Sequence, residues 1–451
     1  MSLDQLPPTS RSEVAWTSAS VEAALLGMTG RRRAGAARGP YRLAALLRAL
    51  EQPHLSAASV KVVGTDGKTS VTRLLAALAT ASGRRVGATT SPHLERVDER
   101  IRIDGGPVEP ERLGRAIDRV GDAAARLEAT WDVAAPSPEG DVPPAERPPG
   151  ERLSFFEMVT AIAVQVFADE QVDLTVVEAG IGGVGDATAA VPAEVVVLTP
   201  VGLDHPQLGS TRREVAREKV GVLPPGGTLV SASQRPEVES VLAEVVADRG
   251  GRWLRAGVDY AVLGRHGDGR GQTVTIRTPA GEVVEAWLPL WGWHQAENAA
   301  TALAALHALE ARVVPVATVR TALAGVAVPG RTELICPRGG PEVVLDGAHD
   351  LPATDALIAA LAERPVPGPT SVLLGATGGR DAAALAGRLE AAGCAVECVD
   401  PHTDEAVLAA SLARATARAR PHGRVVVTGS LHLVGAVRSQ LAAMALDPLG
   451  G

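Results

Sequence analysis

The stretch Gly64-Thr65-Asp66-Gly67-Lys68-Thr69-Ser70 decides the fold prediction. It follows a β-branched run at 60–63 and precedes an apolar-periodic stretch at 71–81. Strand, glycine-bearing loop and helix in this order are typical of a phosphate-binding loop, in which N–H groups at the helix N-terminus face an anion. Lys68 is then expected to reach the outer phosphates of a nucleoside triphosphate, and Thr69 or Ser70 to offer a hydroxyl to Mg²⁺. The loop is shorter than the full pattern, and the alternative is an ordinary strand-to-helix turn with an exposed lysine.

The composition indicates a globular protein with a large core. The 451 residues are 46% hydrophobic and 21% charged, which suits about two or three domains. The net charge is −8 and only 2% of the residues are aromatic, so we expect no nucleic-acid binding. Three cysteines give no disulfide framework, and Cys394-x-x-x-Cys398 favours a half-buried strand over a metal site. Because we find no bilayer-spanning apolar run and no signal-peptide pattern, we expect a cytoplasmic protein with no membrane segment.

Near-continuous β-branched runs alternate with helical patterns, which predicts a doubly wound α/β fold with a parallel sheet. The strands predicted for the first part of the chain are 60–63, 85–90, 172–178 and 194–199, and its predicted helices include 40–50, 71–81 and 155–167. Short alternating strands at 258–288 predict a small antiparallel sheet, and 295–311 predict a helix. We also expect frayed residues at 1–20 and an exposed loop at 134–150, which contains six prolines.

The sequence Val328-Pro329-Gly330-Arg331 indicates a domain junction, because the α/β alternation starts again after it. We therefore expect a P-loop ATP-binding domain at 1–328, which includes the small antiparallel sheet, and a smaller C-terminal α/β domain at 329–451. The strands predicted for the second domain are 342–345, 371–374, 395–398 and 424–427.

Polar side chains follow the predicted strands, at the edge where ligands bind in open α/β sheets. Ser91 follows the second strand, Glu178 ends the third, and His205 follows the fourth. Together with Thr69 they offer hard oxygens and an imidazole to Mg²⁺ beside a nucleotide. The alternatives are a helix-capping acid at Glu178 and a structural histidine at His205.

Other candidate residues allow two interpretations each. Lys219 lies late on a predicted helix and by itself predicts only a solvated lysine. Asp346 and His349 follow a buried strand and can meet an adenine, a ribose or phosphates. The alternative is a turn in which Asp350 caps the next helix, and both interpretations can hold. Arg331, at the predicted junction, is expected to contact phosphate only when the two domains close.

Taken in order, the motifs resemble the folylpolyglutamate synthase/dihydrofolate synthase family, a branch of the Mur ligase superfamily. The resemblance covers roughly residues 40–440, and the ordered set carries it rather than any single motif. The set consists of residues 64–70, 90–94, 99–101, 154–157, 178–188, 202–205, 216–219, 294–299, 329–331, 346–349 and 428–431.

This resemblance implies an ATP-dependent, ADP-forming amide ligase with a Mur-ligase-like fold that uses Mg²⁺. ATP would convert the carboxylate of a pteroate- or folate-type substrate to an acyl phosphate, and the amino group of L-glutamate would displace the phosphate. Catalysis would consist mostly of positioning and charge neutralisation. We also expect a monomer.

The resemblance assigns roles to individual residues as well. Lys68 would hold the outer phosphates, His205 would serve the metal site, and Lys219 matches a lysine that is carbamylated in similar enzymes. The implied nucleotide-binding residues are Gly64, Thr65, Asp66, Gly67, Lys68, Thr69, Ser70, Asn298, Arg331, Asp346 and His349. The implied metal ligands are Thr69, Ser91, Glu178 and His205, and the implied acceptor-pocket residues are Phe156, Asp186 and Ala187.

Four positions depart from the family pattern. Asp66 and Asp350 stand where the family usually carries Asn, and each adds negative charge near a polyphosphate. Val184 and Ala189 replace an Arg and an Asn in the loop that should recognise the acceptor. ATP-dependent ligation is thus better supported than folate specificity. Three hypotheses stay open: a folate:glutamate ligase, the same chemistry on another carboxylate and amine, and a nucleotide-binding relative without activity.

Overall fold

The structure is a computed structural model, and it describes residues 15–31, 40–132, 152–203, 205–267, 270–310, 314–337, 340–375 and 382–446. The predicted exposed loop at 134–150 and Asp204 lie outside these ranges.

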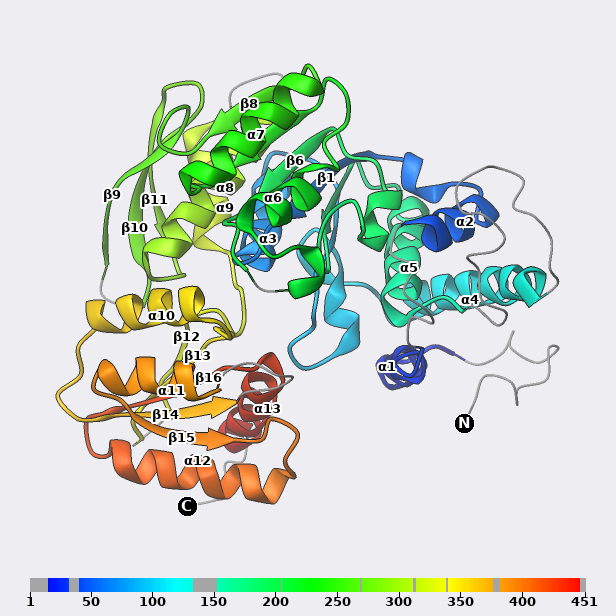
Figure 1. Cartoon of the computed structure of the whole chain (residues 1–451). Helices are drawn as coiled ribbons and strands as arrows, with labels where there is room; N and C mark the ends of the chain where they lie inside the picture. Colours follow the sequence, from blue (N-terminus) through cyan, green and yellow to red (C-terminus); the bar gives the residue numbers. More distant parts are fainter. Residues whose placement is uncertain are drawn as a thin grey trace. The chain divides into compact units, whose positions relative to one another are not determined.

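The chain divides into two compact units (Figure 1). Unit 1 holds residues 1–92, 96–256 and 304–312, and unit 2 holds residues 93–95, 257–303 and 313–451. The antiparallel sheet predicted at 258–288 thus belongs to unit 2 together with the C-terminal strands. The proposed domain boundary after residue 328 stays a prediction.

Unit 1 is built on an eight-stranded sheet with the order β4-β3-β2-β5-β1-β6-β7-β8. The six strands from β2 to β8 in this order run parallel, and β3 and β4 form an antiparallel edge. The strands are β1 (Ala58–Val63), β2 (Val86–Thr89), β3 (Ile101–Ile103), β4 (Gly106–Pro107), β5 (Leu174–Glu178), β6 (Val195–Leu198), β7 (Thr228–Ser231) and β8 (Arg252–Arg255). The predicted doubly wound α/β class is confirmed, and β5, β1 and β6 are neighbours at its centre.

Some helices of unit 1 begin at a capping box formed by their own sequence. Ser154 and Glu157 form a capping box at the start of α5, and Thr17 and Ser20 form one at the start of α1. The predicted fraying at 1–20 is therefore wrong for residues 18–20, which belong to α1. The helices are α1 (Ser18–Gly27), α2 (Tyr41–Ala49), η3 (Pro53–Leu55), α3 (Lys68–Ala81), η4 (Val97–Arg100), α4 (Pro110–Asp132), α5 (Phe155–Asp169), η6 (Ala187–Ala190), η7 (Pro206–Leu208), α6 (Arg212–Val220) and α7 (Pro236–Asp248).

Unit 2 contains two sheets. The three-stranded antiparallel sheet has the order β11-β10-β9, and the five-stranded sheet has the order β12-β13-β16-β14-β15 with only β12 antiparallel. The strands are β9 (Ala261–Gly267), β10 (Gln272–Arg277), β11 (Val283–Leu288), β12 (Glu333–Ile335), β13 (Glu342–Leu345), β14 (Thr370–Gly375), β15 (Ala395–Val399) and β16 (Arg424–Thr428). The helices are α8 (Trp293–Leu309), of which residues up to 303 belong to this unit, α9 (Val316–Ala324), α10 (Leu351–Glu363), α11 (Ala382–Ala391), α12 (Glu405–Ala419) and α13 (Leu431–Leu446).

The five-stranded sheet is covered on both faces, as its β-branched strands predict. Along β16, Val425 and Val427 pack with α12 and α13, whereas Val426 between them packs with α10 and α11. This alternation follows from the period of two along a strand. The polar residues that follow β13 and β16 therefore emerge at the carboxyl edge of a rigid three-layer unit.

In the part of the chain that the structure describes, every helix is too short or too polar to traverse a lipid bilayer.

Candidate active site

The loop between β1 and α3, which we call the β1–α3 loop (residues 64–67), has the strand–turn–helix geometry that phosphate binding requires. Gly64 and Gly67 have positive φ values of 144° and 83°. A Cβ on Gly64 would lie 1.8 Å from Thr199 Oγ1, so only glycine fits at this position. Because α3 begins at Lys68, the N–H groups of its first turn open onto the loop.

The Lys68 ammonium is held at this loop. Its Nζ donates hydrogen bonds to Gly64 O at 3.2 Å and to Thr65 O at 2.9 Å. The Thr65 hydroxyl in turn accepts a hydrogen bond from the Gly202 N–H at 3.0 Å. These contacts tie the loop after β1 to the segment after β6.

Three of the four predicted metal ligands lie together at the carboxyl end of the sheet. Glu178, the last residue of β5, is 2% exposed. Its Oε1 accepts a hydrogen bond from the Thr69 hydroxyl at 3.0 Å, and its Oε2 accepts one from the Ser91 N–H at 3.1 Å. His205, the fourth, is half-exposed and immediately precedes η7, in the segment after β6. The alternative in which Glu178 only caps a helix is not what the structure has.

The donor set suits magnesium better than a transition metal. Within the described ranges, no group of three or more His, Cys, Asp or Glu is arranged to hold a metal ion. Mg²⁺ needs fewer protein ligands, because it usually binds one or two carboxylates and completes its shell with water and phosphate oxygens. The Glu178 carboxylate and the Thr69 hydroxyl next to a phosphate-binding turn fit that chemistry.

Lys219 is buried rather than solvated. It is 1% exposed, lies in the last turn of α6, and donates its Nζ to Gly64 O at 2.7 Å. The preceding residue, Glu218, accepts hydrogen bonds from Gly183 N–H at 3.3 Å and Gly185 N–H at 2.7 Å through Oε1. The turn thus contacts both the β1–α3 loop and the loop between β5 and η6 (residues 179–186), which we call the β5–η6 loop.

The predicted acceptor-pocket residues lie around the same β5–η6 loop. Asp186 accepts hydrogen bonds from Ile181 N–H and Thr188 N–H, both at 2.9 Å, and Ala187 begins η6 as a buried residue. A Cβ on Gly180 would lie 2.9 Å from Phe156 Cζ and 3.2 Å from Asp186 Oδ2. Phe156 and Asp186 therefore flank the same stretch of backbone.

Arg100 adds a buried cation to this part of unit 1. Burial lowers the pKa of its guanidinium to about 10, and the charge of Glu178 acts in the opposite direction. The guanidinium carbon lies 5.0 Å from the centre of the Phe155 ring. The sequence marks Arg100 only as part of a motif, because nothing in its neighbourhood along the chain places it beside Glu178.

In unit 2, Asp346 joins the segment after Arg331 to the turn that carries His349. Its Oδ2 accepts a hydrogen bond from Thr332 N–H at 2.7 Å, and its Oδ1 accepts one from Ala348 N–H at 2.8 Å. His349 Nδ1 lies 2.9 Å from Gly347 O, and a Cβ on Gly347 would lie 2.2 Å from an Arg331 guanidinium nitrogen. The structure thus brings Arg331, Asp346 and His349 together. Asp350 caps α10 by accepting from Ala353 N–H, which confirms the capping interpretation, and a nucleotide contact of Asp346 and His349 stays a prediction.

The start of α8 lies next to the segment that contains Thr332, through His294. Burial lowers the pKa of His294, and the charge of Asp346 acts against that shift. Its Nε2 lies 3.5 Å from the Thr332 hydroxyl. One turn further along α8, Asn298 is buried and donates to Gln295 Oε1 at 3.1 Å.

The chain resembles curated folate enzymes over most of its length. It is 34% identical to folylpolyglutamate synthase of Lacticaseibacillus casei, over 89% of this chain and 94% of the relative. It is 36% identical to dihydrofolate synthase/folylpolyglutamate synthase of Mycobacterium tuberculosis, over 71% of this chain and 66% of the relative. The chain belongs to the folylpolyglutamate synthase/dihydrofolate synthase family. No protein-family model matches the sequence.

Solved structures of this family have the same fold. The chain superimposes on a folylpolyglutamate synthase–AMPPCP–folate complex with a TM-score of 0.82 and 32% identity, over 93% of this chain and 99% of the other. It superimposes on M. tuberculosis folylpolyglutamate synthase complexed with ADP and AMPPCP with a TM-score of 0.79 and 31% identity, again over 93% and 99%. The predictions of a Mur-ligase-like fold and of an ADP-forming amide ligase are confirmed at the level of the family.

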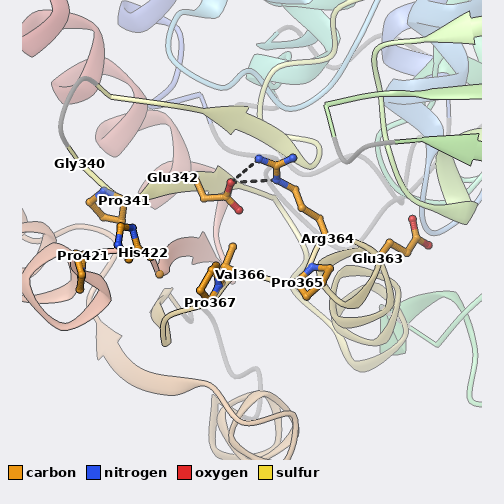
Figure 2. Close-up of a pocket in the computed structure, with 11 residues that line it drawn as sticks. Gly340, Pro341, Glu342, Glu363, Arg364, Pro365, Val366, Pro367, Pro421 and His422 are labelled. Carbon is orange, nitrogen blue, oxygen red and sulfur yellow. Dashed lines mark hydrogen bonds and ion pairs between the residues drawn. The ribbon is translucent and has the colours of Figure 1, made fainter.

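Two cavities of unit 2 are lined by residues outside the candidate site. Two cavities of about 560 Å³ lie in unit 2, and no residue predicted for the site lines either of them. Figure 2 shows the first, where prolines surround Glu342 and Arg364, which are joined by hydrogen bonds of 3.0 and 2.8 Å. Burial raises the pKa of Glu342, but hydrogen bonds from Arg364 and Arg424 outweigh it and hold that pKa below its usual range. The charged groups of this cavity are therefore already paired.

Proposed function

We propose that this chain joins L-glutamate to the carboxylate of a pteroate- or folate-type acceptor, with ATP converted to ADP and phosphate. The observation that carries the proposal is the contact of Thr69, Ser91 and Glu178 beside the β1–α3 loop, in a chain of this family. We further propose that the protein works as a cytoplasmic monomer.

The β1–α3 loop would bind the triphosphate. The N–H groups of the first turn of α3 would face the phosphate oxygens, and the Lys68 ammonium would leave its main-chain partners to pair with the outer phosphates. The loop's own Asp66 adds an anion next to these groups, which Lys68 and a bound cation would offset.

Magnesium would be held by Glu178, His205 and the hydroxyls of Thr69 and Ser91. When bound, the ion would neutralise charge on the phosphate oxygens during phosphoryl transfer. Arg100 would add a neighbouring cation, since the charge of Glu178 acts on its guanidinium.

The reaction would proceed in two steps. An oxygen of the acceptor carboxylate attacks the terminal phosphorus, the bond from that phosphorus to the bridging oxygen breaks, and ADP leaves. The amino nitrogen of glutamate then attacks the acyl carbon, phosphate leaves with the electron pair of the C–O bond, and the amine loses a proton. The protein would contribute by holding the reactants in line and by excluding water.

In unit 2, the residues that would contact the nucleotide are Arg331, Asp346, His349 and Asn298. The support is local: Asp346 fixes the turn through two main-chain N–H groups, and Arg331 lies against the side-chain-free Gly347. Groups that are already held by such bonds lose less freedom when a ligand binds, which lowers the cost of binding.

We also propose that Lys219 can be carbamylated. The residue is 1% exposed, and its Nζ lies 2.7 Å from Gly64 O, beside the proposed phosphate site. The product would replace a buried cation by a carboxylate close to the β1–α3 loop.

A turnover assay with an acceptor panel tests the proposal. We expect ADP and phosphate release when ATP and glutamate are supplied with dihydropteroate or a reduced folate, and a product larger by one glutamyl residue in the mass spectrum. Turnover with neither acceptor, but with another carboxylic acid, would instead support the same chemistry on a non-folate substrate. That second candidate is favoured by Val184, which is 47% exposed on the β5–η6 loop and apolar. Absence of ATP binding in calorimetry would leave only a relative without activity.

A further inference from the structure

We infer that Glu218 is a positioning residue that couples the β5–η6 loop to the β1–α3 loop through the last turn of α6. The inference rests on the proposed function and deepens it, because Glu218 would decide how well the acceptor binds without contacting it.

Three successive N–H groups of the β5–η6 loop end on Glu218. Gly183 and Gly185 donate to its Oε1 at 3.3 and 2.7 Å, and Val184 donates to its main-chain oxygen at 3.0 Å. The first and third of these groups meet one carboxylate oxygen, and the second meets the carbonyl oxygen of the same residue. One residue therefore fixes three neighbours of the loop.

The β5–η6 loop needs these hydrogen bonds to stay ordered, because it is rich in glycine. It contains glycines at positions 180, 182, 183 and 185, and glycine loses more backbone entropy on ordering than any other residue. Its approach to α6 is close, since a Cβ on Gly183 would lie 2.5 Å from both Glu218 O and Lys219 O. Asp186, which holds Ile181 and Thr188, continues directly from this fastened stretch.

The next residue of the same turn holds the other loop. Lys219 donates to Gly64 O at 2.7 Å, and Lys68 donates to the same oxygen at 3.2 Å. A ligand that draws Lys68 towards phosphate therefore leaves Lys219 as the partner of this carbonyl. Because Glu218 and Lys219 are adjacent in a helical turn, order in one loop favours order in the other.

Steady-state kinetics of Glu218→Ala, Glu218→Gln and Arg217→Ala test the inference. Gln keeps an oxygen that accepts from Gly183 and Gly185, whereas Ala does not. We expect the KM for the acceptor to rise about tenfold or more in Glu218→Ala, with a smaller rise in the KM for ATP because coupling is reciprocal, and both to be largely restored in Glu218→Gln. Arg217→Ala is the matched control, because Arg217 lies in the same turn but is 60% exposed and pairs with Glu244. A folded Glu218→Ala protein with an unchanged acceptor KM would overturn the inference.

Hydrogen–deuterium exchange tests the coupling without turnover, so that failure of the proposed function can be told apart from failure of this inference. In the wild type, a non-hydrolysable ATP analogue should slow exchange in the peptide 181–188 although it binds at the β1–α3 loop. In Glu218→Ala this effect should be lost, and in Arg217→Ala it should persist. If Glu218→Ala does not fold, Glu218→Asp gives the same comparison, because its shorter side chain withdraws the acceptor from Gly183 and Gly185. Exchange in the peptide 181–188 that is no faster in Glu218→Asp than in Arg217→Ala would then refute the inference. Equal protection of 181–188 in the wild type and in Glu218→Ala would refute the coupling even if every acceptor were inactive.

Discussion

Two buried lysines of unit 1 make the same bond in different surroundings. Lys61 and Lys219 are each 1% exposed, and each donates its Nζ to a main-chain oxygen at 2.7 Å, Val191 O for Lys61 and Gly64 O for Lys219. Lys61 lies in the central strand β1 and holds the chain just after η6. Lys219 lies on α6 and holds the β1–α3 loop.

Burial of a cation therefore does not by itself identify a functional site. Burial lowers the pKa of Lys61 to about 8, with Asp186 acting against the shift, yet its partner is a carbonyl that no candidate catalytic group shares. By contrast, Gly64 O, the partner of Lys219, also accepts a hydrogen bond from Lys68. A shared acceptor, rather than depth, is what connects Lys219 to the proposed chemistry.

The largest effect should come from Lys68→Ala, which removes the cation that shares Gly64 O with Lys219. We expect the rate of ADP formation to fall about a thousandfold, because the outer phosphates lose their main protein cation. Lys61→Met, measured in the same assay, should stay within about tenfold of the wild type. A wild-type rate in Lys68→Ala would contradict the role assigned to this residue.

Lys219→Ala should have the next largest effect and should separate the two buried lysines. We expect a loss of about a hundredfold in kcat, partly recovered when formate or acetate is added, because a free carboxylate can take the place of the carbamate. Lys61→Ala should show no recovery under the same additions. Full activity of Lys219→Ala without any added acid would reject carbamylation.

Lys61 should control the pH dependence of stability more than of turnover. Its folded-state pKa of about 8 lies below the ordinary 10.5, so between these pH values the unfolded chain binds the proton and the folded chain does not. The free energy of unfolding should therefore rise with pH across this window, by about 3 kcal/mol from this group, and the penalty should be fully present below pH 8.

Urea denaturation at a series of pH values measures this effect. The control is Lys61→Met, which should lack the contribution, so the difference between the two proteins should change through the window. Parallel pH profiles of the wild type and Lys61→Met would show that Lys61 titrates normally.

The smallest effect should be that of Lys61→Met on acceptor binding. Loss of the bond to Val191 O should loosen η6, which begins at Ala187, and raise the KM for the acceptor about two- to fivefold. The KM for ATP should not change. An equal rise in both KM values would mean that Lys61 supports the whole sheet rather than this segment.

Local patterns predicted the elements of the fold, and long-range packing accounts for what they missed. The run at 60–63 and the glycines after it predict β1, the turn and α3, because each depends on neighbours in the chain. Short strands such as β7 and β8 were not predicted, since their pairing with β6 and with each other decides them.

The same division applies to the candidate site. The rule that ligands bind beyond the carboxyl ends of strands correctly grouped Thr69, Ser91 and Glu178. The rule could not find Arg100 or Glu218, because their contacts depend on the folded chain. Arg100 lies 78 residues before Glu178, whose charge acts on it, and Glu218 contacts glycines more than 30 positions earlier in the sequence. Only the family resemblance gave Lys219 a role, since its own neighbourhood looks like that of a surface lysine.

The close packing of the β5–η6 loop against α6 determines which positions of this protein can be re-engineered. A side chain at Gly183 would collide with main-chain oxygens, which cannot move aside as a flexible side chain can. Ile181 and Val184, on either side of it, are 44% and 47% exposed. Libraries aimed at a new range of substrates should therefore randomise those two codons and leave Gly182 and Gly183 between them untouched.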